Sequence, residues 1–347
     1  MPERNRLSAR VERADASRQL RLTKHHGSGN DFLVLLDGRD DSVGSDRVLR
    51  GDEMLGTDGV LGADGVLGPD EVRALCDRHR GFGADGLIVG RTGRGGADLE
   101  MILSNADGSL AEISGNGIRC LVQAAEGAGM VGAGAVSVDT GGGRRMVDFR
   151  DLGDGLGLAE VDMGPARLGD ELPLDREPVS LTPPLTVRRA RTVEVGNPHV
   201  VLLAGDGTFD LEMVGPQIER SRPGGANVEL VRSFERRQDG SSALEIEVWE
   251  RGVGITSSCG TGACAAAAAS FEWGLVSHQV EVRTSGGSLR VRVGEASVTL
   301  SGPTRLVGEV VVDLTLLRGL VSELRPRGAV DQDHGAGGLG GEVVKAL

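Results

Sequence analysis

Short runs of alternating apolar and polar residues dominate the chain, and this alternation is typical of half-buried β-strands. The first run begins near Leu20 and turns at residues 27–30, and turn-forming residues separate the later runs. The last run, residues 307–317, is either a strand or a strand that continues into a helix. We expect strands within residues 20–36, 87–89, 99–103, 136–149, 156–168, 188–203, 244–249, 280–298 and 307–317.

Two longer apolar segments have a helical pattern instead. Residues 263–269 are almost entirely alanine, which is the best helix former, so a helix should begin near Gly260. A second helix should follow Ser114, and a short third one should cover residues 70–79, with Asp70 near its N-terminus. The pattern therefore predicts a strand-rich α/β chain with one long helix in each half.

The two long helices belong to an internal duplication. An offset of 145 residues carries SGNG at 114–117 onto CGTG at 259–262, and it carries Asn105 onto Glu250. The segment GNDF at 29–32 similarly resembles GNPH at 196–199. This period is too long for a solenoid, so we expect two similar domains that face each other, each offering a helix N-terminus.

Cys259 is a candidate reactive group because it directly precedes the alanine-rich helix. The first amides of a helix lack internal partners and carry partial positive charge, which lowers a thiol's pKa and binds carboxylates. A free cysteine is more often a small buried apolar residue. Here cysteine is an unusual helix cap among small glycines, so we favour a functional role.

Composition narrows the possible partners. A net charge of −13 over 347 residues argues against nucleic acid or an anionic membrane surface, and 2% aromatic residues argue against a base-stacking platform. The four cysteines have no C-x-x-C spacing, so we expect neither a metal site nor a disulfide framework. No run reaches the ~20 apolar residues of a membrane span, and no signal peptide is evident. We expect a cytoplasmic protein that acts on a small molecule.

Six blocks in one order resemble the diaminopimelate epimerase family, and together they span Lys24 to Ala266. They are KHHGSGNDFLVLLD (24–37), RHRGFGADGL (78–87), NADGSLAEISGNGIRC (105–120), GNPHVV (196–201), GANVELV (225–231) and WERGVGITSSCGTGACAA (249–266). The last block is especially specific. One departure matters, since the family has a catalytic cysteine where this chain has Ser114.

The resemblance implies an α/β (α+β) fold of two pseudo-symmetric domains, each a mostly antiparallel, barrel-like sheet around a central helix. It implies an isomerase that converts L,L-2,6-diaminopimelate to the meso form without a cofactor, in lysine and peptidoglycan-precursor biosynthesis. It also implies a homodimer. We expect a disordered leader (1–20), an N-terminal domain (21–155) with a low-complexity insertion (38–69), a C-terminal domain (156–305), a strand returning to the first domain (306–322) and a flexible tail (323–347).

Inverting an α-carbon needs a base on one face and an acid on the other, with stabilisation of the charge that develops on the carboxylate. The resemblance implies that Cys259 is one acid/base group and that His199 and Glu250 orient each other and tune it. It implies carboxylate binding by Asn30, Gly115, Asn116, Gly260 and Thr261, and binding of the distal amino-acid group by Asn105, Asn197, Asn227, Glu250 and Arg251. Each residue also has a structural explanation, such as asparagine in a turn, and their joint occurrence in matched blocks favours function.

Ser114 leaves three interpretations open. Serine is a good helix N-cap, worth about 1 kcal/mol, and its hydroxyl is a far poorer base than a thiolate. It can act as a relay or acid, through a bound water, in a slow epimerase. A one-cysteine site can instead serve a lyase or dehydratase, as in proline racemase-like enzymes, or the chain can bind diaminopimelate without catalysis. We favour the epimerase, then the lyase, then the binding protein.

Overall fold

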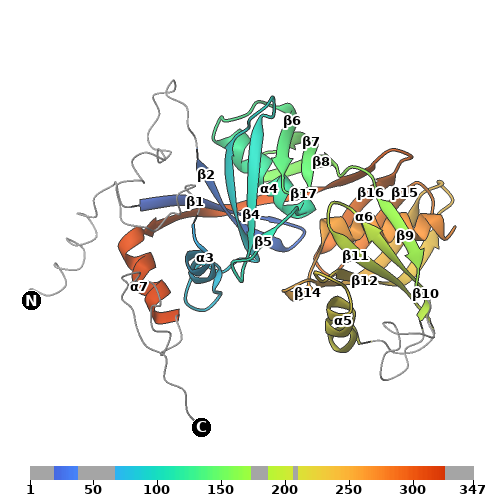
Figure 1. Ribbon diagram of the computed structural model, residues 1–347. Coiled ribbons are helices and arrows are strands. Elements are labelled where there is room, and N and C mark those ends of the chain that lie inside the picture. Colours follow the sequence, from blue (N-terminus) through green and yellow to red (C-terminus); the bar gives the residue numbers. More distant parts are fainter. Residues whose placement is uncertain (1–18, 38–66, 173–186, 206–209, 325–347) are drawn as a thin grey trace, which may run out of the picture.

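The computed structural model describes residues 19–37, 67–172, 187–205 and 210–324 (Figure 1). Residues 1–18 of the predicted leader, the insertion up to residue 66 and the tail from residue 325 lie outside these ranges. Gln19 and Leu20, which we assigned to the leader, begin the first strand, because Leu20 is fully buried.

The N-terminal half is a closed barrel in which each strand pairs with the next and the last pairs with the first. The pairs β2–β3 and β4–β6 are parallel and the others are antiparallel. A very short strand, β5 (Leu110–Ala111), extends β4 at the rim. The ring runs through β1 (Gln19–Gly27), β2 (Asn30–Asp37), β3 (Gly86–Thr92), β4 (Leu99–Asn105), β6 (Gly134–Thr140), β7 (Gly143–Asp151), β8 (Leu156–Asp162) and β17 (Val298–Asp313).

The C-terminal half repeats this arrangement in a curved sheet that ends on the first residues of β17. The short strand β14 (Gly254–Thr256) extends β13 as β5 extends β4. The sheet runs through β9 (Arg167–Glu171), β10 (Val187–Glu194), β11 (Pro198–Ala204), β12 (Asn227–Arg236), β13 (Ser242–Glu250), β15 (Gln279–Thr284), β16 (Gly287–Val293) and β17.

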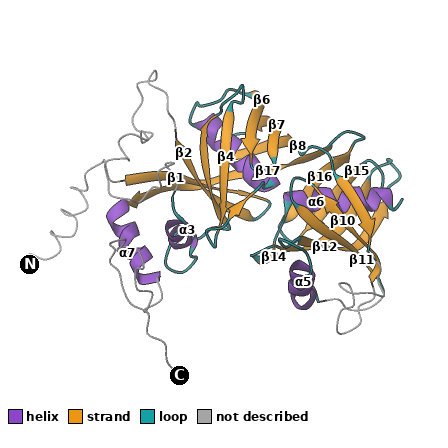
Figure 2. Ribbon diagram, in the orientation of Figure 1, coloured by secondary structure: helices purple, strands orange, loops and turns teal. Residues whose placement is uncertain are grey.

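Each barrel encloses one helix, α4 (Gly115–Gly127) in the first and α6 (Gly260–Glu272) in the second (Figure 2). The offset of 145 residues carries α4 onto α6 at both ends, as the duplicated sequence predicts. Residues 260–270 are all buried, and a helix that is apolar on every side belongs in such an interior. The predicted fold class, two pseudo-symmetric barrel-like domains around central helices, is confirmed.

Within the described ranges, three shorter helices lie outside the barrels. Helices α3 (Pro69–Cys76) and α7 (Leu314–Leu324) pack together over the first barrel, and α5 (Leu211–Arg220) covers the second. Helix α3 ends three residues before the predicted end. The carboxylate of Asp77 accepts the backbone N–H groups of His79 and Arg80 and so stabilises a turn there.

Two expected boundaries differ from the structure. Strand β8, which we placed at the start of the second domain, pairs with β7 and β17 and closes the first barrel. The strand expected over 306–322 is the end of a longer one, which starts at Val298, leaves the second barrel and pairs with β1 up to Asp313. Residues from Leu314 form a helix because Asp313 caps its first amides.

Candidate active site

The N-termini of α4 and α6 touch where the two barrels meet. A Cβ atom on Gly260 would lie 2.8 Å from the Cα of Gly115, so a side chain at either position would collide with the backbone of the other helix. Both positions are therefore restricted to glycine. The backbone amides of both helix starts converge on this contact. Two partially positive helix ends in one place favour an anion such as a carboxylate.

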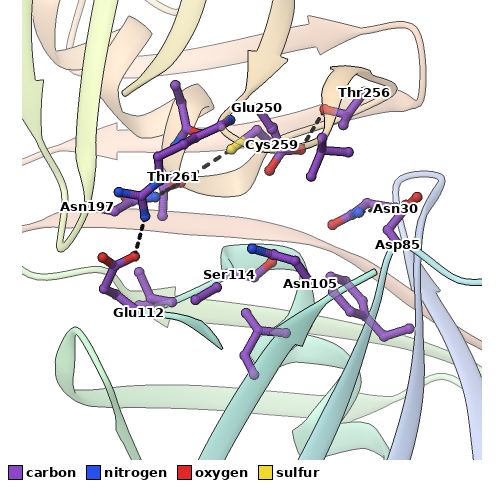
Figure 3. A pocket seen from close by; sticks show the side chains of 17 residues that line it. Asn30, Asp85, Asn105, Glu112, Ser114, Asn197, Glu250, Thr256, Cys259 and Thr261 are labelled. Atoms are coloured by element: carbon purple, nitrogen blue, oxygen red, sulfur yellow. Dashed lines mark hydrogen bonds and ion pairs between the residues drawn. The ribbon is translucent and has the colours of Figure 1, made fainter. Parts of the chain in front are cut away.

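Ser114 and Cys259 hold the same position at the two helix starts. Each is an extended N-cap residue, and each accepts a hydrogen bond from the amide three residues on: Gly117 N–H to Ser114 Oγ at 3.0 Å and Gly262 N–H to Cys259 Sγ at 3.3 Å. Figure 3 shows the two side chains on opposite sides of one pocket. The arrangement provides one polar group for each face of a bound carbon centre.

Most of the predicted site residues line this pocket. The predicted lining residues are Asn30, Asn105, Ser114, Asn197, Asn227, Glu250, Arg251, Cys259 and Thr261, and they come from both halves. Gly115, Asn116, His199 and Gly260 are not among the residues that line it. Two acidic side chains that our sequence analysis did not select, Asp85 and Glu112, also face the pocket. Both lie within blocks of the family resemblance, which was the signal available for them.

Asn116 connects the two halves with its side chain. Its Nδ2 donates to the carbonyl of Ser258 at 3.0 Å and to Oδ1 of Asn30 at 3.2 Å, while its own Oδ1 accepts from Arg119. Asn116 and Arg119 are both fully buried. Since Ser258 precedes Cys259, this clamp holds the cysteine's loop against the first barrel. Asn30 is fixed further by donating to Asp85 Oδ2 at 2.7 Å.

The predicted contact between His199 and Glu250 is wrong. The two ring nitrogens of His199 are taken by Glu229 Oε1 at 2.7 Å and by Asn197 Oδ1 at 2.8 Å. Glu250 instead accepts a hydrogen bond from the Thr256 hydroxyl and lies beside Cys259. His199 contacts Asn197 of the pocket wall without lining the pocket itself, and Glu250 is the carboxylate next to the thiol.

The electrostatics of Cys259 also differ from our expectation. We expected the helix start to lower the thiol pKa, but burial, followed by the nearby Glu250 and Glu229, raises it well above its usual value. Hydrogen bonds from Thr261 and Gly262 oppose this rise. Burial likewise raises the pKa of Glu250 to about 7. Cys259 is thus a protonated acid at neutral pH, beside a carboxyl group able to gain or lose a proton there.

Arg251 connects the two halves of the chain at the pocket. Its guanidinium donates to Glu112 Oε2 of the first half at 2.8 Å and to the carbonyl of Gly224 at 3.0 Å. Asn227 Oδ1 accepts the backbone N–H of Arg251 at 2.8 Å and so fixes the turn that carries it. A cation and an anion therefore lie together at the distal end, where a zwitterionic group needs both.

Neither a metal cluster nor a membrane helix is found in the part of the chain that the structure describes. No three histidine, cysteine, aspartate or glutamate side chains of those residues gather as metal ligands would. None of the described helices is long and apolar enough to cross a membrane. All four cysteines are free and buried, and Cys120, whose Sγ accepts from Thr304, lies away from the pocket.

Known proteins match this chain over most of its length. The family profile of diaminopimelate epimerase matches residues 22–169 and 191–307. A diaminopimelate epimerase of Magnetococcus marinus is 37% identical, covering 84% of this chain and 97% of its own, and one of Nostoc punctiforme is 35% identical, covering 83% and 98%. A probable proline racemase of Agrobacterium radiobacter shares the fold, with a TM-score of 0.59 at 17% identity over 84% of this chain and 92% of its own. With the paired helix starts and the shared pocket, these matches show that the chain belongs to the diaminopimelate epimerase family.

Proposed function

We propose that this chain is an amino-acid epimerase that converts L,L-2,6-diaminopimelate to the meso form by proton transfer at one α-carbon. The observation that carries the proposal is the pair of touching helix N-termini, with a thiol and a hydroxyl on opposite sides of the pocket. Family membership supplies the substrate. Because the acid, the base and the anion-binding amides all come from the chain, the reaction needs no cofactor.

The substrate's reacting carboxylate lies at the helix N-termini, where amides stabilise the charge that develops as the α-proton leaves. Glu250 takes the proton of the Cys259 thiol, and the resulting thiolate removes the α-proton from one face. Glu250 then releases its proton to solvent, which balances the proton that water returns on the other face. The opposite face receives a proton from the Ser114 side. Ser114 Oγ already accepts the Gly117 amide, so its hydroxyl proton is free to point into the cleft, and a water restores it afterwards.

The distal amino-acid group lies between Arg251 and the acidic and amide side chains around it. Arg251 binds its carboxylate, and Glu112 accepts from its ammonium group. Asn227 acts by fixing the Arg251 turn, while Asn105 and Asn197 face the same pocket. This assignment uses the charge pair already present at the pocket.

The wider setting follows from the same proposal. We infer a cytoplasmic enzyme that acts as a homodimer on a small molecule and binds no nucleic acid. The net charge of −13 supports the last point, since it disfavours a polyanion. The homodimer rests on the family alone.

The test is NMR of the purified protein with L,L-diaminopimelate in deuterated buffer. The wild type should yield the meso isomer with deuterium at one α-carbon, and Cys259→Ala should not. Cys76→Ala is the matched control, because Cys76, the last residue of α3, is buried in the outer core of the first barrel and does not line the pocket. Ser114→Cys should accelerate the exchange. A silent wild type beside an active Ser114→Cys would instead mean a lyase or a binding protein in an intact epimerase pocket.

A further inference from the structure

A chain of hydrogen bonds starts at a buried carboxyl group outside the pocket, runs through residues of the pocket wall and ends at the sulfur of Cys259. Glu229 Oε1 lies 2.7 Å from His199 Nδ1, and His199 Nε2 lies 2.8 Å from Asn197 Oδ1. Asn197 Nδ2 then reaches Thr261 Oγ1 at 3.4 Å, and Thr261 Oγ1 lies 3.3 Å from Cys259 Sγ. Glu229 and His199 are almost completely buried, so water does not compete for these bonds.

The donors and acceptors of this chain have one consistent direction. Two atoms without a shared proton would repel at 2.7 Å, so one proton lies between Glu229 Oε1 and His199 Nδ1. An amide oxygen can only accept, so Nε2 of His199 carries a hydrogen and donates to Asn197 Oδ1, whether the proton beside Glu229 sits on the oxygen or on Nδ1. The amide N–H of Asn197 therefore donates to Thr261, and the Thr261 hydroxyl is left to donate to Cys259 Sγ. An amide does not pass protons on, so the chain orients groups and relays nothing.

The equivalent positions in the first half carry no such chain. The pairing of Phe32 with Gly86 is equivalent to that of His199 with Asn227. Two residues further along the same strands, Ile88 therefore occupies the position equivalent to Glu229. A Cβ atom on Gly117 would meet Ile88 at 3.1 Å, and one on the equivalent Gly262 would meet Glu229 at 2.5 Å. The duplicated fold therefore supports Ser114 with an apolar pair and Cys259 with a buried polar pair.

We propose that Glu229 is a positioning residue that acts through His199, Asn197 and Thr261 to aim a hydroxyl hydrogen at Cys259 and so stabilise its thiolate. This inference rests on the proposed acid/base role of Cys259. Among the described residues, the titratable groups that face this region besides Glu229 and His199 are Cys259 itself, the N-cap residue of α6, and Glu250 at the end of β13. A thiolate next to two carboxyl groups is strongly disfavoured, and the directed hydroxyl and the Gly262 amide are the two donors that oppose this.

The test measures the thiolate without requiring turnover. The rate of Cys259 alkylation by iodoacetamide is followed against pH, with peptide mass spectrometry separating Cys259 from the other three cysteines. Glu229→Ile introduces the isoleucine that the first half has at the equivalent position, Ile88. It also leaves the His199 ring free to take the other tautomer, which would reverse the direction of the hydrogen bonds. Glu229→Gln keeps the direction, because its amide N–H donates to Nδ1 and Nε2 retains its hydrogen. Thr261→Val removes the terminal donor and reports on the same bond if Glu229→Ile does not fold.

We expect Thr261→Val to raise the apparent alkylation pKa by about one unit relative to wild type, which slows alkylation ~10-fold below that pKa, since hydrogen bonds to charged groups are the strong ones. Glu229→Ile and Glu229→Gln both remove a carboxylate that disfavours the thiolate, so they are compared with each other: Glu229→Ile should lie about one unit above Glu229→Gln, which keeps the direction of the chain. The double variant Glu229→Ile/Thr261→Val should match Glu229→Ile, because both changes remove the same bond.

The same profile in Glu229→Ile and Glu229→Gln would overturn the inference, since the charge rather than the direction would then matter. A further rise in the double variant above Glu229→Ile, or an unchanged profile in Thr261→Val, would also overturn it. These outcomes are separate from the NMR test. A protein without epimerase activity can still show the alkylation shifts, and an active one can lack them.

Discussion

Glu250 should set the lower pH limit of the reaction. Its pKa is raised to about 7, chiefly because the cleft removes the carboxylate from water, while the Thr256 hydroxyl partly opposes the rise. Only the ionised form can take the proton of Cys259. We therefore predict that kcat/KM for L,L-diaminopimelate rises with pH and levels off above about 7. One pH unit below the pKa about one molecule in eleven is ionised, so the rate at pH 6 should be ~10-fold below the plateau.

The assay is deuterium incorporation at the α-carbon, followed by NMR across this pH range. Glu250→Gln should be slow and should lose the rise below pH 7, because its amide does not titrate. Glu247→Gln is the matched control, since Glu247 lies on the same strand, is exposed, and pairs with Arg232. The reasoning is refuted if Glu250→Gln keeps the wild-type rise, since the titrating group would then lie elsewhere.

The same pKa predicts an opposite effect on stability. The folded state holds a proton on Glu250 up to about pH 7, whereas the unfolded state releases it near the ordinary value of 4.5. The folded state thus binds more protons in this window, and its stability falls as pH rises through it. Glu250→Gln avoids this loss, so its melting temperature relative to wild type should be higher at pH 8 than at pH 5. A difference independent of pH would contradict the assigned pKa.

Three further predictions concern other parts of the structure. Gly260→Ala should destabilise the protein by about 1–3 kcal/mol in urea unfolding, because its Cβ would meet backbone of the other helix, whereas Gly127→Ala, with open space around it, should be neutral or stabilising. Burial lowers the pKa of His25 below 6.5, so the unfolded state binds more protons than the folded state near that pH. The free energy of unfolding should therefore fall as pH drops below 6.5, and His25→Gln should weaken this trend in unfolding measured against pH. Glu112→Gln should raise KM for diaminopimelate ~10-fold with little change in kcat or melting temperature, because its pairing with Arg251 is half exposed and contributes little to folding; an unchanged KM would remove Glu112 from the binding set.

The repeated pattern predicted the fold well because strand and helix periodicity can be read within short segments, and the duplication can be read by comparing such segments. The matching tetrapeptides at 114–117 and 259–262 located both central helices and their caps, and the alanine run made α6 evident. The alternation also predicted most strands. It did not show that β8 closes the first barrel, because strand pairing depends on contacts between distant segments.

The sequence predicted which residues belong to the site, but it did not predict which of them contact one another. Residues within matched blocks could be assigned to a pocket, and most of them line it. The partner of His199 could not be predicted from the sequence. Glu229 is a single charged residue within an apolar strand, and its contact with His199 depends on the pairing of β11 with β12. The pKa of Cys259 was predicted in the wrong direction because the helix terminus was visible in the sequence and the burial and neighbouring carboxyl groups were not.

Strand β17 has a consequence for how the chain is made. It starts at Val298 and supplies the closing strand of a barrel whose first strand begins at Gln19. A ribosome delivers residues in order, at about 5–20 per second, so the early strands wait for nearly the whole chain before their ring can close. Until then β1 and β8 each present an unpaired edge, the kind of surface that invites association with other nascent chains. The second barrel needs only the start of β17, so it can complete its sheet first, and the order of assembly should run against the order of synthesis.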